Sequence, residues 1–131
     1  MASPQLVIDA SALLAALNGE PGGSAVVQRL GQAAMSTVNW SEVVQKALAH
    51  GVTANPQDLR TDVEALGVEF VPFSSSQAEQ AAALWPTTRH AGLSLGDRAC
   101  LALAVELGVP AVTTDKAWDG VALPIAVEVV R

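Results

Sequence analysis

Short apolar runs alternate with segments of helical pattern along the whole chain, and this alternation limits the folds that the sequence can adopt. The runs suit strands that are buried on both faces of a sheet. The predicted strands are Leu6–Ile8, Ala34–Val38, Val68–Val71, Ala111–Thr113 and Ile125–Val130. The predicted helices are Ser11–Asn18, Ser24–Leu30, Trp40–His50, Pro56–Leu66, Ser75–Leu84 and Leu95–Leu107. This order predicts an α/β fold, a single three-layer domain whose parallel sheet of about five strands is flanked by helices.

Glycine and proline separate these elements. Gly51, Gly67 and Gly108 follow predicted helices, where glycine commonly ends a helix. The polar segment Thr87–Gly92 predicts a loop. We find no linker, internal repeat or low-complexity tract, and 131 residues suit one domain over residues 1–131.

Composition excludes several classes of protein. Half of the residues are hydrophobic and only 15% are charged, which argues against disorder. The net charge of −6 argues against a broadly basic surface for nucleic acid, although a bound divalent cation can invert the charge locally. Cys100 is the only cysteine, so an intrachain disulfide and a thiolate metal cluster are excluded, and a small buried thiol is expected. The first residues lack the basic region of a signal peptide and no apolar stretch approaches the length of a membrane span, so we expect a soluble, cytoplasmic protein.

Two aspartates follow predicted strands that are far apart in the sequence. Asp9 comes directly after Leu6–Ile8, and Asp115 comes shortly after Ala111–Thr113. The carboxyl ends of parallel strands lie along one edge of the sheet, where ligands bind. We therefore expect these two acids to share a site.

Two further acids lie in the first turns of predicted helices, Glu42 and Asp97. Helices that follow strands begin at the same edge of the sheet, so all four carboxylates could converge there. Each acid also has a purely structural interpretation. Asp9 and Asp115 could cap helices that begin near Ser11 and at Lys116. The segments Asn39–Glu42 and Ser94–Asp97 both fit a capping box.

Convergence of four carboxylates would be unfavourable without a counterion. Two unit charges about 4 Å apart cost on the order of 1 kcal/mol in water and about 4 kcal/mol near a protein surface. Capping alone does not require the four acids to share a site. A hard divalent cation such as Mg²⁺ or Mn²⁺ would make their convergence favourable, because it prefers carboxylate oxygen and water as ligands.

Four motifs carry a resemblance to a known family. They are Asp9-Ala10-Ser11-Ala12-Leu13, Asn39-Trp40-Ser41-Glu42-Val43, Leu93-Ser94-Leu95-Gly96-Asp97-Arg98 and Thr113-Thr114-Asp115-Lys116-Ala117-Trp118. In this order the motifs resemble the PIN-domain family, and more narrowly the VapC-type ribonuclease toxins of type II toxin–antitoxin systems. The resemblance covers the whole chain and implies a PIN-like fold.

This resemblance implies an endoribonuclease that hydrolyses RNA phosphodiester bonds with Mg²⁺ or Mn²⁺. By position, the catalytic and metal-binding set would be Asp9, Glu42, Asp97 and Asp115, with Asp119 as a further acidic member. Ser11 and Thr114 would be hydroxyls that orient a carboxylate or a bound water. The implied partners are an RNA substrate, a second copy of the chain in a homodimer, and a cognate antitoxin whose C-terminal segment enters the acidic groove.

Two other functions remain open. The first is a non-catalytic PIN-like module that acts through protein contacts, although none of its four acidic positions is lost. The second is another metal-dependent phosphoester hydrolase, but the second aspartate of an Asp-x-Asp motif is missing after the first strand, and no P-loop is present.

Basic and aromatic side chains raise a smaller question. Lys46, Arg98 and Lys116 lie close to the acids in sequence and could pair with a carboxylate or contact a phosphate. His50 and His90 are expected at the surface, where His90 and Arg89 could touch RNA. The three tryptophans, Trp40, Trp85 and Trp118, could stack on bases, but packing is the expected role for them in a small apolar domain.

Overall fold

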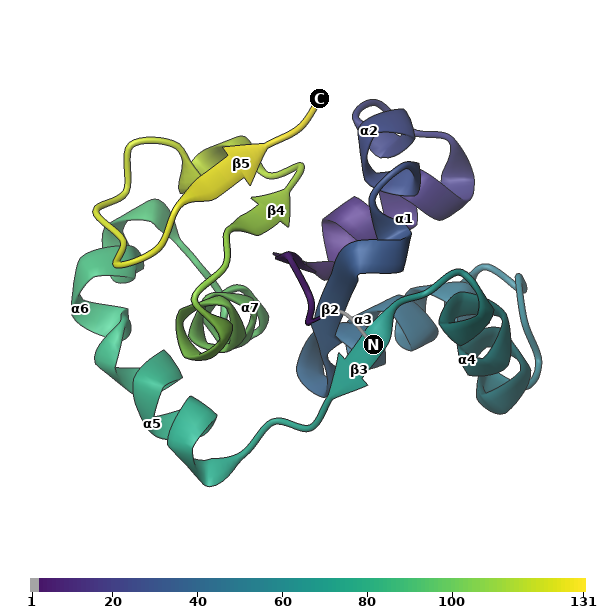
Figure 1. Ribbon diagram of the computed structural model, residues 1–131, viewed down its shortest axis with the longest axis horizontal. Helices are drawn as coiled ribbons and strands as arrows, with labels where there is room; N and C mark the ends of the chain where they lie inside the picture. The colour runs from purple at the N-terminus through teal and green to yellow at the C-terminus, as the bar shows by residue number, and fades with distance from the viewer. Residues whose placement is uncertain (1–2) are drawn as a thin grey trace.

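The computed structural model describes residues 3–131, so residues 1–2 of the predicted domain lie outside the described part. Its centre is a five-stranded sheet in the order β3-β2-β1-β4-β5, in which every neighbouring pair is parallel (Figure 1). The strands are β1 (Leu6–Ile8), β2 (Ala33–Ser36), β3 (Glu69–Val71), β4 (Ala111–Thr113) and β5 (Val127–Val129). This architecture confirms the predicted α/β fold class.

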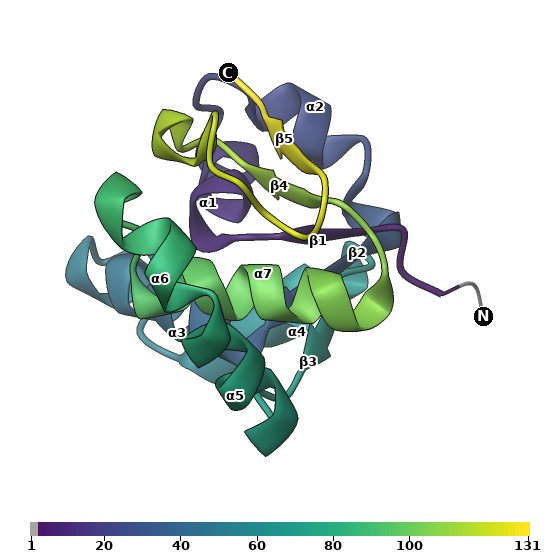
Figure 2. The same ribbon diagram turned by 90° about the vertical axis from the view of Figure 1, so that its left-hand side faces the viewer.

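Helices cover both faces of the sheet. One face carries α1 (Ala10–Asn18), α2 (Gly23–Val27), α3 (Thr37–Ala49) and α4 (Pro56–Ala65). The other carries α5 (Ser75–Ala83), α6 (Trp85–Thr88) and α7 (Leu95–Leu107), which lie in front of the sheet in Figure 2. Three short 3₁₀ helices complete the chain, η1 (Leu30–Gln32), η2 (Arg89–Ala91) and η3 (Lys116–Trp118).

Alternate residues of the central strand enter the two halves of the core. Leu6 and Ile8 pack with the helices of the first face, whereas Val7 packs with α7 on the opposite face. Successive side chains of a strand point to opposite sides, so a strand covered on both faces is apolar at every position. This explains why Leu6–Ile8 forms a continuous apolar run.

The second predicted strand and the helix after it are shifted from their predicted bounds. β2 ends at Ser36, and α3 begins at Thr37 rather than at Trp40. The Ser36 hydroxyl accepts a hydrogen bond from the Val38 backbone N–H at 3.2 Å and so acts as the N-cap. Asn39 therefore lies inside the first turn of α3, and the predicted capping box at Asn39–Glu42 is wrong.

The predicted loop at Thr87–Gly92 is also wrong, because this segment is largely helical. α6 begins at Trp85 with Pro86 in its first turn, a position where the missing N–H of proline costs nothing. The buried Thr88 hydroxyl donates to the Leu84 carbonyl at 2.8 Å, and the Arg89 guanidinium lies over the Trp85 ring. These local contacts stabilise helical turns that a polar composition does not reveal.

The helix predicted at Ser24–Leu30 is divided into α2 and η1. By contrast, α7 and β4 have the predicted bounds, and α7 begins at an N-cap serine and ends at Gly108 in the left-handed region.

Across residues 3–131, no helix is long and apolar enough to cross a membrane.

Candidate active site

Asp9 lies at the junction between β1 and α1, where its carboxylate is buried. Its Oδ1 accepts hydrogen bonds from the Ala12 backbone N–H at 2.8 Å and from the Ser11 hydroxyl at 2.7 Å. Its Oδ2 accepts from the Thr113 hydroxyl at 2.5 Å. Only 3% of the residue is exposed, and this burial raises the pKa of Asp9 to about 6 although the three hydrogen bonds act in the opposite direction. Asp9 thus caps α1, as its structural interpretation predicted, while its carboxylate remains poorly solvated.

Thr113 connects Asp9 to the loop that carries Asp115. Its hydroxyl donates to Asp9 and accepts from the Asp115 backbone N–H at 3.0 Å. β4 pairs directly with β1, and this pairing brings the last residue of β4 beside Asp9. Thr113 was not among the predicted site residues, although it belongs both to a predicted strand and to the motif that contains Asp115. A hydroxyl at the last position of a buried strand, two residues before an acid, was the available signal.

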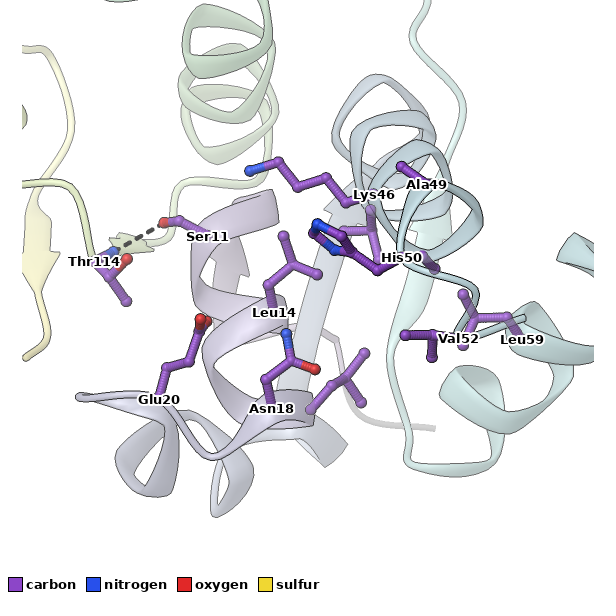
Figure 3. Close-up of a pocket in the computed structure, with 13 residues that line it drawn as sticks. Ser11, Leu14, Asn18, Glu20, Lys46, Ala49, His50, Val52, Leu59 and Thr114 are labelled. Carbon is purple, nitrogen blue, oxygen red and sulfur yellow. Dashed lines mark hydrogen bonds between the residues drawn. The ribbon is translucent and has the colours of Figure 1, made fainter. Parts of the chain in front are cut away.

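Ser11 and Thr114 belong to the same network. The Ser11 hydroxyl donates to Asp9, lies 3.2 Å from the Thr113 hydroxyl, and accepts from the Thr114 backbone N–H at 3.1 Å. Figure 3 shows this last hydrogen bond at one end of a cavity. Ser11 thus orients the Asp9 carboxylate directly, whereas Thr114 takes part through its backbone.

Asp97 lies in the first turn of α7 and forms the predicted capping box. Its Oδ2 accepts from the Ser94 backbone N–H at 2.8 Å, and its own N–H donates to the Ser94 hydroxyl at 3.1 Å. Partial burial raises the pKa of Asp97, and the charge of Asp115 acts in the same direction. Asp97 in turn contributes to the raised pKa of Asp9. Asp97 therefore links the three aspartates, since it acts on Asp9 and is itself affected by Asp115.

Glu42 reaches the same region from α3. Its Oε1 accepts from the Asn39 side-chain amide at 3.2 Å, and its carboxylate lies against Gly96 in the first turn of α7. Cys100, one turn further along α7, is completely buried as predicted. Burial raises the pKa of the Cys100 thiol, and the charges of Asp9, Asp97 and Glu42 add to this effect. The three carboxylates thus all act on one point inside the domain.

Asp115 and Asp119 lie on the exposed side of this region. Asp115 is the N-cap of η3, and its Oδ1 accepts from the Ala117 backbone N–H at 2.9 Å. Asp119 lies at the opposite end of η3 and is exposed. The capping interpretation therefore holds for Asp115.

The donor set suits a hard cation, but the acids do not form a closed cage. Within residues 3–131, no three Asp, Glu, His or Cys side chains lie close enough together to hold one ion. Mg²⁺ usually keeps several water ligands and binds one or two carboxylates directly, so an open arrangement of carboxylate oxygens fits it. Asp9 and Asp97, which are the two acids with raised pKa values, would gain most from a neighbouring positive charge.

A cavity of about 650 Å³ lies between α1, α3 and α4 and reaches Ser11 and Thr114 of the hydroxyl network. Leu14, Val43 and Leu59 supply apolar walls. Ser11 and Thr114 line one end of the cavity, and Lys46 extends across it toward Ser11 (Figure 3). The cavity is therefore continuous with the hydroxyl network that holds Asp9.

Some of the other basic and aromatic side chains have structural contacts, and others lie at the surface. The Arg98 guanidinium donates to the Ala81 carbonyl at 2.9 Å and so joins α7 to α5. Trp118 is buried, and Trp40 packs on Phe70 with 4.6 Å between ring centroids. Trp85 is 49% exposed, and both histidines, His50 and His90, lie at the surface as predicted.

Comparison with known proteins agrees with this architecture. The family model for the PIN domain matches residues 6–123. No curated protein matches the chain. A toxin–antitoxin complex from Klebsiella pneumoniae is similar in structure, with a TM-score of 0.69 and 22% identity over 88% of this chain and 91% of that chain.

Two other solved structures have the same fold. DNA-bound VapBC from Salmonella typhimurium has a TM-score of 0.67 and 14% identity, covering 95% of this chain and 97% of that chain. A VapBC family member from Mycobacterium tuberculosis has a TM-score of 0.57 and 24% identity, covering 98% of this chain and 99% of that chain. The family model spans most of the sequence, and its match includes all four acids of the candidate site. The chain therefore belongs to the PIN domain family.

Proposed function

We propose that this protein is a metal-dependent endoribonuclease and the toxin of a toxin–antitoxin pair. The observation that carries the proposal is the buried carboxylate of Asp9, held by three hydrogen bonds at the carboxyl ends of two adjacent strands. The Asp97 carboxylate acts on it from the start of α7, and the Asp115 carboxylate at the start of η3 acts in turn on Asp97. Capping of α1 explains the position of Asp9 but not the gathering of further negative charge around it.

Each acid has a role in this proposal. Asp9 and Asp97 would hold Mg²⁺ or Mn²⁺, Asp115 would contribute from the exposed side, and Glu42 would complete the set from α3. Thr113 and Ser11 fix the orientation of the Asp9 carboxylate through the hydroxyl network. A bound divalent cation supplies positive charge to the scissile phosphate and lowers the pKa of water for attack on phosphorus. Asp119 could add a further, more distant carboxylate.

RNA is the proposed substrate, and the protein would act on it in the cytoplasm. The chain as a whole is acidic, so the metal and Lys46 at the cavity would supply the local positive charge that a phosphate needs. The similar solved structures are toxin–antitoxin complexes, which supports a cognate antitoxin as the protein partner. A homodimer is proposed as the assembly state.

Cleavage assays with matched variants test the catalytic proposal. We expect the wild-type protein to cut RNA with Mg²⁺ or Mn²⁺ and to stop when EDTA is added. Asp9→Asn and Asp97→Asn should each lower the rate by at least about 100-fold, which corresponds to about 2.7 kcal/mol. Asp62→Asn, on the exposed surface of α4, is the matched control and should cut like the wild type.

The same assay distinguishes the other two functions. A folded wild-type protein that cuts no RNA with either metal would support a non-catalytic interaction module. Hydrolysis of a small phosphomonoester without RNA cleavage would support another phosphoester hydrolase. Growth arrest on expression, relieved by an adjacent antitoxin gene, would support the role of a toxin.

A further inference from the structure

Gly96 is the point where the carboxylate of Glu42 meets α7. A Cβ atom at this position would lie 2.1 Å from Glu42 Oε1 and 2.9 Å from Glu42 Cδ. Real Cβ atoms do not approach other atoms so closely. Gly96 lies within α7 and is not among the glycines with positive φ, so its backbone conformation does not require glycine. Glycine is needed here for another reason: the Glu42 carboxylate occupies the space that a side chain at position 96 would fill.

Asn39 fixes the same contact from the side of α3. Its Nδ2 donates to Glu42 Oε1 at 3.2 Å and to the Gly96 carbonyl at 2.9 Å. Both partners can only accept, so the amide nitrogen of Asn39, rather than its oxygen, must face them. Asn39 is 1% exposed, and within residues 3–131 its Oδ1 has no hydrogen-bond partner. The side chain thus leaves one buried polar atom unsatisfied while it holds Glu42 and Gly96 together.

We propose that Gly96 and Asn39 are positioning residues that set the Glu42 carboxylate against the first turn of α7, where Asp97 follows Gly96 in the sequence. Gly96 leaves the space that the carboxylate occupies, and Asn39 donates the hydrogen bond that holds it there. This inference rests on the proposed function, in which Glu42 and Asp97 belong to one metal-binding set.

Two properties of Glu42 explain why its carboxylate needs residues that hold it in place: its charge and its flexibility. The carboxylates of Asp9, Asp97 and Glu42 all lie near Cys100, and repulsion between like charges favours conformations in which they separate. Glutamate is also a flexible side chain that loses rotamer freedom when it is held in one place. The N-terminus of α7 and the Asn39 amide both favour negative charge at this point. A side chain at position 96 would occupy the position of the Glu42 carboxylate and leave Glu42 free to turn toward solvent.

Gly96→Ala tests the proposal without disturbing the fold. The atom that blocks the new methyl group is the end of a flexible side chain, so Glu42 can move away, and alanine favours helix more than glycine does. We expect the melting temperature to stay within a few degrees of wild type. The affinity for Mn²⁺, measured by electron paramagnetic resonance, should fall about tenfold or more, as second-sphere changes typically cause. RNA cleavage should fall toward the level of Glu42→Ala.

Gly31→Ala is the matched control. A Cβ at Gly31 in η1 would meet nothing within 4 Å, so this variant should bind Mn²⁺ and cleave RNA like the wild type. The double variant Gly96→Ala with Glu42→Ala should match Glu42→Ala alone, because no carboxylate remains to be displaced. Wild-type affinity and cleavage in Gly96→Ala would overturn the proposal, as would a further loss in the double variant.

A structural measurement separates this inference from the proposed function. If the wild-type protein neither binds Mn²⁺ nor cleaves RNA, the proposed function fails. A crystal structure of Gly96→Ala then decides the positioning role. A Glu42 carboxylate displaced from α7 would support it, and an unmoved carboxylate would overturn it.

Discussion

At the scale of single residues, Asp9 combines a stabilising contact with an unfavourable charge. Its hydrogen bond from Ala12 begins α1, but its burial disfavours the ionised form. The interval between its ordinary pKa of 3.8 and the folded value of about 6 corresponds to about 3 kcal/mol between the two protonation states. In the absence of metal at neutral pH, the buried charge of Asp9 therefore lowers the stability of the folded protein.

Asp9→Asn should stabilise the metal-free protein. The amide oxygen can keep the bonds from Ala12 and Ser11, and its nitrogen can donate to Thr113, whose hydroxyl can turn. Removal of the buried charge should then raise the free energy of unfolding at pH 7.5 by about 1–3 kcal/mol. Urea denaturation in EDTA measures this difference. If Asp9→Asn is less stable than the wild type under these conditions, the buried charge of Asp9 does not destabilise the metal-free protein.

The same residue predicts how stability depends on pH. The folded-state pKa of Asp9 is raised, so between pH 3.8 and about 6 the folded protein binds more protons than the unfolded chain. The stabilising contribution of protonated Asp9 is complete below pH 3.8 and is lost as the pH rises through about 6. The advantage of Asp9→Asn over wild type in EDTA should therefore shrink as the pH falls from 7.5 to 5. An advantage that stays constant over this range would exclude Asp9 as its cause.

Three residues of the site were not predicted in their observed roles, because these roles depend on distant contacts. Thr113 lies 104 positions from Asp9 in the sequence, and Asn39 lies 57 positions from Gly96. A threonine in a strand, an asparagine in a helix and a glycine in a helix all have ordinary local interpretations. The positions of Asp9 and Asp115 at the carboxyl edge of the sheet were predictable, since an acid that closely follows a buried strand has a known place in a parallel sheet.

At the scale of elements, strong local signals were predictive and competing signals were not. α7 has the capping box at Ser94 and a left-handed glycine at Gly108, and its bounds were predicted correctly. At the end of β2, the β-branched pair Thr37 and Val38 favours a strand by composition. The buried Ser36 hydroxyl begins α3 instead. One capping hydrogen bond thus outweighs the intrinsic preference of two residues.

Ser36→Ala should destabilise the protein through the start of α3. Loss of an N-cap side chain typically costs about 1 kcal/mol, within a range of about 0.5–2 kcal/mol. Urea denaturation at pH 7.5 measures the change. Thr53 lies in the exposed loop before α4 and is not an N-cap residue. Thr53→Ala is therefore the control, and it should lower the free energy of unfolding by less than Ser36→Ala does. Equal stability of Ser36→Ala and wild type would mean that packing alone sets the start of α3.

At the scale of the whole molecule, the order of elements determines where the acids meet. β1 is central and pairs with both β2 and β4, so the segments that follow these strands begin at one edge of the sheet. The alternation of strands and helices was enough to predict this arrangement. It was not enough to predict how tightly the carboxylates approach one another, because that distance depends on side-chain conformation.

Metal binding should therefore appear as a gain in stability of the whole domain. A ligand that binds only the folded state stabilises it by about 2.7 kcal/mol at a concentration 100 times its dissociation constant. Such a gain should raise the melting temperature of wild type by on the order of 10 °C for a domain of this size. Asp9→Asn should begin with a higher melting temperature in EDTA but respond less to Mn²⁺, because it lacks the buried charge that the ion would neutralise. Calorimetry of both proteins with and without Mn²⁺ measures these shifts, and equal shifts would show that Asp9 contributes nothing to metal binding.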